Sequence, residues 1–268
     1  MFPLPGKTFP ASAEALRAAL EQSIASVVRP AGPMVTVEDA GYPKLKAVHI
    51  SLDGANAGER PPRRPQPPVG AVQPGLQLEN FTVSGHPLLV QRARVDFTCT
   101  AREVRLGQAR DKDGNPLFVL LEAAEGKVEV VVALSDLEAL VLAGAKAEAV
   151  KQGVSVESVR IELQTRSERN LEAVVQVRAK KLFLSAALRI SGSLAIDEQL
   201  NARLAGLKCA GEGALGTLAC GFIAPQLARF DGREFSLLAL PLGEVKLRDV
   251  RIAAGRELRV TAQFGRPA

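Results

Sequence analysis

The two histidines are the first residues to consider for catalysis, because the chain contains no others. His49 alternates with Val48 and Ile50, so we expect it on the polar side of a strand. His86 lies between a glycine and a proline, a context typical of a turn. Neither has a serine, cysteine or aspartate beside it in a recognisable nucleophile motif, and no G-x-S-x-G sequence occurs. The sequence therefore predicts no enzyme, although a triad can also assemble from residues far apart in the chain.

A glycine-rich stretch, GEGALG at residues 211–216, fits the G-x-G-x-x-G pattern of dinucleotide-binding folds. In those folds the glycines let the backbone approach a pyrophosphate at a helix N-terminus. Only 52 residues follow the motif here, which is too few for the sheet that such a fold requires. A glycine-rich hairpin connection explains the stretch more simply, so we predict no cofactor.

The stretch RDKDGNPLF resembles a calcium-binding loop in its acidic spacing. Positions 1, 3, 5 and 12 of such a loop correspond to Asp111, Asp113, Asn115 and Glu122. The sixth position, which requires glycine, is Pro116, and no helices are expected on either side. The same residues are typical of a hairpin turn, so we predict a turn and no metal site.

Three cysteines cannot all pair within one chain, and none has the C-x-x-C spacing of a zinc site. Cys99 is expected on the apolar face of a strand. Cys209 and Cys220 could approach each other across a turn, but free thiols in a reducing compartment are the simpler expectation. The N-terminal sequence MFPLPGKTFPAS contains no signal-peptide core, and no apolar run reaches 18 residues. We expect a cytoplasmic protein, or a periplasmic one if an export signal has been removed.

The composition of the chain argues against a nucleic-acid partner. A net charge of +5 is small for a nucleic-acid-binding protein, and aromatic residues make up only 4% of the chain, so platforms for base stacking are nearly absent. We therefore predict no nucleic-acid partner. The apolar fraction of 47% comes mainly from leucine, valine and alanine, which supply enough apolar surface for a sizeable core.

The chain is expected to form one fold with a proline-rich insertion. Residues 1–54 supply an N-terminal helix and strands of that fold, residues 55–75 form a basic loop or linker, and residues 76–268 form the main unit. The prolines and glycines of the loop oppose strand pairing and favour an extended segment. Its arginines could dock on anionic membranes, although a solvated disordered loop is the simpler interpretation: Arg60, Arg63 and Arg64.

Two long helices are predicted, at residues 12–28 and 135–152, with a shorter helical region from Thr217. The first carries an apolar stripe at helical spacing: Leu16, Leu20, Ile24, Val27 and Val28. The second begins with a capping box formed by Ser135 and Glu138. Its first half, LEALVLAGA, is apolar nearly all round, which indicates a buried helix.

Alternation of apolar and polar residues predicts long strands elsewhere. The stretch LFLSAALRISGSLAI, residues 182–196, has an apolar residue or glycine at every second position. The alternation extends back to Leu171 with one slip between Ala179 and Leu182, which a β-bulge at Lys180 and Lys181 would produce. Long, bent, one-sided strands are typical of a strongly curved sheet.

Such a sheet needs a covering layer, and two helices can cover several long strands only if the sheet wraps around them. We therefore expect an α+β fold in which a long, strongly curved, mainly antiparallel β-sheet wraps around one or two long α-helices. Because few large aromatic residues are present to fill its interior, this sheet could enclose an elongated apolar cavity. A cavity of that kind suits acyl chains.

Several stretches then resemble a known family. A helix with the sequence SDLEALVLAGAKAEAVKQG precedes VESVRIELQTR and a long alternating run that ends in LRISGSLAID. Upstream, LENFTVSGHPLLVQRARVDFTCTAREVRL resembles the strands that precede the helix. Over roughly residues 76–265 the pattern resembles the tubular lipid-binding (TULIP) superfamily, and most closely its bacterial LmeA-like phospholipid-binding family. The resemblance implies a long helix cradled in a curved antiparallel sheet that holds lipid without chemistry. The 55–75 insert and the lack of an export signal or lipoprotein anchor depart from the family pattern.

The expected function is non-catalytic binding or transfer of a lipid, either a phospholipid or a fatty acid, with an anionic membrane surface as a further partner. The lipid-binding residues are predicted on the second helix and on the strands that follow it: Leu137, Leu140, Val141, Val159, Ile161, Leu163, Leu182, Leu184, Leu188, Ile190, Leu194 and Ile196. The alternative is a structural or scaffold protein with a fully packed core and no ligand, because alternation reports burial and not a ligand.

Overall fold

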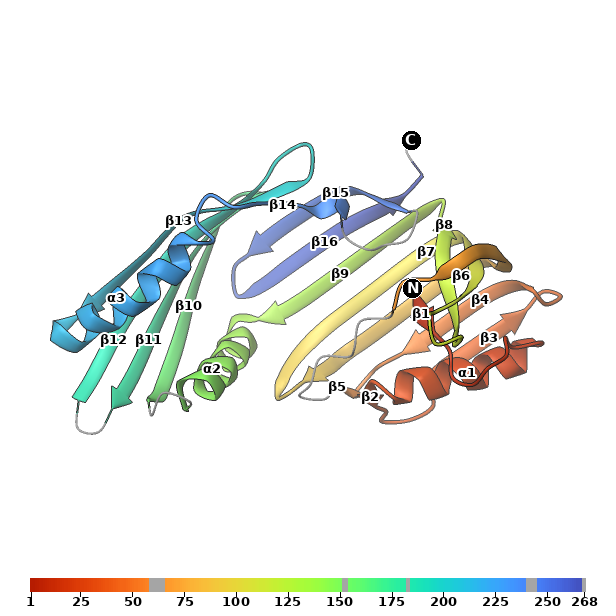
Figure 1. The fold of residues 1–268 in the computed structure, drawn as a ribbon, viewed down its shortest axis with the longest axis horizontal. Coiled ribbons are helices and arrows are strands. Elements are labelled where there is room, and N and C mark those ends of the chain that lie inside the picture. Colours follow the sequence, from red (N-terminus) through yellow and green to blue (C-terminus); the bar gives the residue numbers. More distant parts are fainter. Residues whose placement is uncertain (58–65, 151–153, 182–183, 240–244, 267–268) are drawn as a thin grey trace. The chain divides into compact units, whose positions relative to one another are not determined.

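A computed structural model describes residues 1–57, 66–150, 154–181, 184–239 and 245–266 (Figure 1). The chain divides into two compact units. Unit 1 comprises Met1–Val130, Ala239–Asp249 and Thr261–Ala268, and unit 2 comprises Val131–Leu238 and Val250–Val260. The predicted docking arginines, Arg60, Arg63 and Arg64, lie outside the described residues.

The predicted wrapped sheet is wrong. Strands account for 59% of the residues and helices for 20%, in two sheets that are neither closed nor strongly curled. The three α-helices of the described residues contain only 13, 17 and 16 residues, and long helix wrapping is not found. The alternation of apolar and polar residues shows which face of a strand is apolar, but it carries no information on the curvature of the sheet. The coarser expectation, a β-rich α+β fold, is confirmed.

The larger sheet has β6 (Val69–Val90) and β7 (Ala93–Arg110) at its centre, with 22 and 18 residues. Its main path runs β15-β16-β9-β7-β6-β4-β3, with shorter strands added beside it. Strands β4 and β5 run parallel to β6, whereas the pairs β6–β7 and β7–β8 are antiparallel. The remaining strands of this sheet are β1 (Phe2–Pro3), β2 (Val28–Arg29), β3 (Val35–Asp39), β4 (Lys44–Ser51), β5 (Asn56–Ala57), β8 (Pro116–Glu122), β9 (Glu125–Ala133), β15 (Lys246–Ala254) and β16 (Glu257–Gly265).

Helix α1 (Ala13–Ala25) confirms the first predicted helix, with shorter bounds. The Ser12 hydroxyl accepts a hydrogen bond from the backbone N–H of Ala15 at 3.2 Å and so caps its start. Leu16, Leu20 and Ile24 are buried on one side of the helix, which packs against β3. Its other side carries charged residues, so α1 is an amphipathic helix with one buried and one solvent-exposed side.

Unit 2 contains the smaller sheet, in the order β10-β11-β12-β13-β14 with antiparallel pairing throughout. Helices α2 and α3 precede and follow its four long strands along the chain (Figure 1). The elements are α2 (Leu134–Val150), β10 (Ser155–Ser167), β11 (Asn170–Lys181), β12 (Leu184–Ile196), β13 (Asn201–Glu212), α3 (Gly213–Ala228) and β14 (Glu234–Ser236), followed by a 3₁₀ turn, η1 (Leu237–Ala239). No helix among the described residues is long and apolar enough to cross a bilayer.

The run of alternating residues from 171 to 196 is two strands and not one bulged strand. β11 ends at Lys181, β12 begins at Leu184, and these two residues are antiparallel partners. The pairing continues without a register shift to Asn170 and Ala195. The predicted bulge is therefore a chain reversal. The two lysines interrupt the alternation in either case, and no glycine or proline at residues 180–184 signals a turn.

Two turns, one in each unit, depend on the same pair of residue types. Asp111 accepts hydrogen bonds from the backbone and side-chain N–H groups of Asn115 at 2.9 and 3.0 Å, which confirms the predicted hairpin turn. Asp197 accepts the equivalent bonds from Asn201 at 2.7 and 3.0 Å. The bonds from Asn115, the side-chain bond first, lower the pKa of Asp111, and those from Asn201, the backbone bond first, lower the pKa of Asp197.

Candidate functional site

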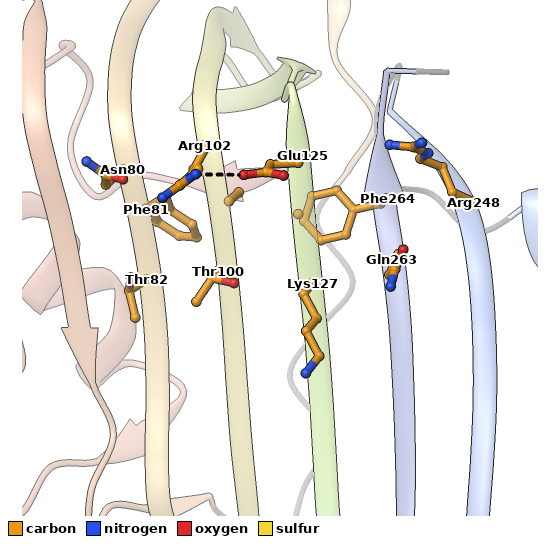
Figure 2. Close-up of a pocket in the computed structure, with 12 residues that line it drawn as sticks. Asn80, Phe81, Thr82, Thr100, Arg102, Glu125, Lys127, Arg248, Gln263 and Phe264 are labelled. Atoms are coloured by element: carbon orange, nitrogen blue, oxygen red, sulfur yellow. Dashed lines mark hydrogen bonds and ion pairs between the residues drawn. The ribbon is translucent and has the colours of Figure 1, made fainter. Parts of the chain in front are cut away.

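An open hollow of about 520 Å³ lies over the larger sheet, within unit 1. Figure 2 shows its side chains on β6, β7, β9, β15 and β16. The ring of Phe264 lies where a side chain at Gly126 would be, so these two residues pack across neighbouring strands. Arg102 pairs with Glu125 at 3.0 Å, and Lys127 pairs with a neighbouring glutamate at 2.7 Å. Because two of the three cations that line the hollow already have anionic partners and all lie in open solvent, the hollow offers only a weak site for an anion.

His86 lies beside a carboxylate and a hydroxyl, an arrangement that the sequence did not reveal. Its Nε2 is 3.0 Å from Thr98 Oγ1, and its Nδ1 is 3.7 Å from Asp96 Oδ1. The order of groups is that of a catalytic triad. The side chains of His86 and Asp96 are both about half exposed, and none of the three residues lines either of the hollows found in unit 1. The backbone N–H of His86 also donates to Asp53 at 2.6 Å, which lowers the pKa of that carboxyl. His86 lies within β6, so the turn expected at His86 is wrong. We interpret this group as fastening the turn at residues 53–54 to β6.

The candidate site with the most predicted residues is one face of the unit 2 sheet. Directly opposed residues of antiparallel strands project on the same side of a sheet. The register places Val159, Val177 and Leu188 in one such row, and Ile161, Val175, Ile190 and Cys209 in the next. Further rows continue the pattern, and together they form what we call the apolar face: Val159, Ile161, Leu163, Leu171, Ala173, Val175, Val177, Leu188, Ile190, Leu194, Leu204, Leu207 and Cys209.

The opposite face of the same sheet is polar. Arg160, Gln176 and Arg189 are mutual partners one position out of phase with the apolar face. Gln176 donates to Glu162 at 2.9 Å, and Arg166 pairs with Glu172 at 2.8 Å. Val174 and Ala187 also lie on this side, so the sheet is largely but not wholly one-sided, in line with the alternation.

Helix α2 covers one part of the apolar face. Leu137 and Leu142 pack against a buried cluster that contains Val159 and Ile161. The Glu138 carboxylate accepts a hydrogen bond from the backbone N–H of Ile161 at 2.9 Å, which ties the helix to the strand. Even so, no residue of α2 is fully buried, and Val141 is 37% exposed. The expectation of a buried helix is wrong, since only one side of this helix packs on the sheet.

Helix α3 covers another part of the same face, and the glycine-rich stretch explains how. A side chain at Gly211 would lie 2.0 Å from the backbone of Gly216, so the helix and β13 touch through their main chains. Gly213 has a φ of +71°, which allows the sharp change from strand to helix. The stretch is therefore a strand-to-helix junction, and the predicted hairpin connection is wrong.

A disulfide also joins α3 to the sheet. Cys209 on β13 and Cys220 on α3 are bonded, with their Cα atoms 5.5 Å apart. The expectation of free thiols is wrong for this pair, because the chain reverses at residue 213 and brings the two residues face to face. Cys99 remains free and half-buried, and burial raises the pKa of its thiol.

Between the two helices the apolar face is incompletely covered. Val175, Val177 and Ile190 are only half-buried, whereas Val159 and Leu188 are buried. Leu163 and Leu194 are also half-buried. The four rows from Val159 onward extend about 20 Å along the strands, a length comparable with a fatty acyl chain.

Half of the twelve predicted lipid-binding residues lie on this face. Leu137 packs on its buried cluster, Leu140 and Val141 lie on α2 among its partly or largely exposed positions, and Ile196 is buried at the far end of β12. Leu184 is the first residue of β12, and Leu182 lies outside the described residues. The residues placed on the face are Val159, Ile161, Leu163, Leu188, Ile190 and Leu194.

The sequence analysis missed the contributions of β11 and β13 to this face. Val175 and Val177 alternate in the same way as the residues that were chosen, so the signal was present. Leu204 and Leu207 were harder to find, because a register shift between Ser191 and Ser193 of β12 breaks the match with β13.

Comparison of the chain with models of protein families, with curated proteins and with solved structures gives no significant match.

Proposed function

We propose that this chain is a non-catalytic lipid-binding protein that takes a phospholipid or fatty acyl chain on the apolar face of unit 2. The observation that carries the proposal is the incomplete cover of that face between α2 and α3. Exposed apolar surface is costly in water and commonly marks a binding site. The residues between the helices are apolar and carry no group that would orient a polar substrate.

The resemblance to the TULIP superfamily supports the same class of ligand through its sequence pattern alone. Since the sheets are not strongly curled, the proposed site is an open face and not an enclosed tunnel. An acyl chain lying along β11 and β12 would complete the contacts of Val175, Val177 and Ile190. We therefore place the ligand along the strand direction.

The disulfide favours an oxidising compartment, because such bonds form and persist outside the reducing cytosol. This supports the periplasmic alternative over the cytoplasmic one. Cysteine labelling under denaturing conditions, before and after reduction, would test it: protein isolated from its host should show one free thiol before reduction and three after.

Native mass spectrometry with organic extraction tests the function directly. The purified protein should carry co-purified lipid and should bind a fluorescent fatty acid. A protein that carries no lipid and does not bind the probe would contradict the proposal and support the scaffold alternative.

Two neighbouring substitutions locate the site. Ile190→Lys places a charge on the apolar face, where burying it costs enough to weaken probe binding by about tenfold or more. Ser191→Lys is the matched control, because Ser191 is also half-buried but lies on the opposite face. Equal probe binding by both variants, with urea midpoints close to wild type, would place the ligand elsewhere.

A further inference from the structure

The outward side of α3 carries an apolar stripe that the proposed lipid site does not use. Leu218 is 61% exposed and Phe222 is 81% exposed. Together with Pro225 and Arg229 they follow helical spacing on one side of the helix, and all four are exposed. We call these four residues the α3 stripe.

The stripe cannot turn inward to join the core, because the opposite side of the helix is fixed. Gly216 touches the backbone of Gly211, and Cys220 is bonded to Cys209. Since Cys220 lies midway between Leu218 and Phe222 along the helix and on its other side, the disulfide holds those two side chains toward the solvent.

From Leu218 to Pro225 the stripe is unsuited to specific polar recognition. Within α3 only Thr217 and Gln226 have polar side chains, and there is no charged residue. The Thr217 hydroxyl already donates to the backbone carbonyl of Gly213 at 3.0 Å. Protein interfaces usually form about one hydrogen bond per 100–200 Å², which this surface cannot supply from Leu218 to Pro225.

Cations and aromatic rings gather at the C-terminal end of the stripe. Arg229 ends the helix, and the guanidinium of Arg233 lies 5.9 Å from the ring of Phe230 and 5.2 Å from the ring of Phe235. Both rings are partly exposed. Of the nearby acids, Asp231 accepts a hydrogen bond from the backbone N–H of Leu207 at 2.9 Å. Glu234 lies 3.9 Å from Arg203, and Glu212 precedes the other end of the helix.

We propose that the α3 stripe docks on an anionic lipid bilayer, with Leu218 and Phe222 inserted among the acyl chains and Arg229 and Arg233 at the headgroups. Apolar side chains flanked by arginines suit the bilayer interface, where the charges stay in the polar layer. The proposal deepens the proposed function by naming the surface with which the carrier meets its lipid source, but the two can be tested separately.

The chain has no tryptophan, so a single introduced tryptophan reports on one position only. In Phe222→Trp, phosphatidylcholine vesicles containing phosphatidylglycerol should shift the emission to the blue and shield it from iodide. Val69→Trp is the matched control, since Val69 is 60% exposed in unit 1 and should report no change. Equal responses at both positions, or none at position 222, would overturn the proposal.

Vesicle flotation then separates the apolar contribution of Phe222 from the electrostatic contribution of the two arginines. Phe222→Asp should lower vesicle binding about tenfold or more, whereas Val69→Asp should leave it unchanged. Arg229→Gln with Arg233→Gln should lower binding to anionic vesicles by about fivefold per arginine, with little effect on neutral ones.

The same variants keep this proposal distinct from the lipid site. Phe222→Asp should retain fatty-acid binding, because the stripe faces away from the apolar face. Loss of vesicle binding with retained fatty-acid binding supports docking by α3, and loss of both would overturn it by showing that one surface serves both roles. A wild-type dimer that Phe222→Asp converts to a monomer, without vesicle binding by either, would assign the stripe to contact between copies of the chain and overturn the bilayer proposal.

Discussion

Helices α1 and α2 show how differently the two units treat their apolar side chains. Helix α1 buries Leu16, Leu20 and Ile24 and turns charged residues to solvent. Helix α2 has a higher apolar content but buries no residue fully. In unit 1 the amphipathic pattern completes a core, whereas in unit 2 apolar residues occupy positions that packing within the chain does not require. Surplus apolar surface of this kind is more informative about a ligand than a well-filled core is.

The largest effect should come from truncating the helix that completes a core. Leu16 is 1% exposed, so Leu16→Ala should lower the free energy of unfolding by about 3–4 kcal/mol through lost contacts and a cavity. Val141→Ala on α2 should cost well under about 1 kcal/mol, since its side chain is partly in water already. Urea denaturation of both variants measures the contrast. Similar losses would show that α2 is packed as tightly as α1.

Reduction of the disulfide should weaken unit 2 selectively. The bond closes a loop between residues 11 apart in sequence, which corresponds to about 3 kcal/mol of chain entropy in the unfolded state. Hydrogen exchange should accelerate in α3 and β13 after reduction, while α1 and β4 exchange as before. Uniform acceleration across both units would contradict this separation.

A pair of glycine substitutions should change stability in opposite directions. Gly211→Ala places a methyl group against the backbone of Gly216 and should cost about 1–3 kcal/mol. Gly221→Ala lies on the open side of α3, meets no atom within 4 Å, and should stabilise the helix by about 0.5–1 kcal/mol. Thermal unfolding of the two variants tests the close contact of α3 with β13. A destabilising Gly221→Ala would place that side of the helix against other residues.

The smallest expected effect concerns the acid sensitivity of the two Asp–Asn turns, and it should be the same in unit 1 and unit 2. The pKa values of Asp111 and Asp197 are lowered in the folded state, so each carboxylate contributes stability above the pKa it has when unfolded. That contribution should be lost as the pH falls through the lowered folded pKa, below about pH 4. Asp111→Asn and Asp197→Asn should each reduce the acid sensitivity of unfolding, followed by circular dichroism. A change in only one variant would show that the two turns are not equivalent.

Much of the secondary structure could be predicted because it depends on local patterns. The start of α1 follows from Ser12, and the turn at Asp111 follows from its side chain and those of its neighbours. The one-sidedness of β10–β12 follows from alternation. These features are encoded within a few residues of where they occur.

The arrangement of these elements could not be predicted in the same way. A change from β11 to an antiparallel β12 has the same effect on alternation as a bulge, and only the pairing of Lys181 with Leu184 distinguishes the two. The contact of Gly211 with Gly216 depends on where α3 lies, which the motif does not specify. The cluster at His86 brings together His86 of β6 with Asp96 and Thr98 of β7, which are neighbours only because the two strands pair. Each of these depends on tertiary pairing.

The order of segments in unit 1 has a consequence for biosynthesis. Unit 1 includes residues 1–130 and two segments near the C-terminus, 239–249 and 261–268. The main part of unit 2, residues 131–238, lies in sequence between residue 130 and the first of these segments. Strand β9 obtains its neighbour β16 only after residue 265 has left the ribosome. The strand pairs of the β10–β14 sheet are complete by residue 236, and the later residues of unit 2 add only edge contacts such as the hydrogen bond from the backbone N–H of Ile252 to the carbonyl of Glu168. On a nascent chain this inserted sheet can therefore form first, while the N-terminal strands await their last partners. Slow, non-local pairing of this kind gives unit 1 the higher contact order and a greater need for protection during synthesis.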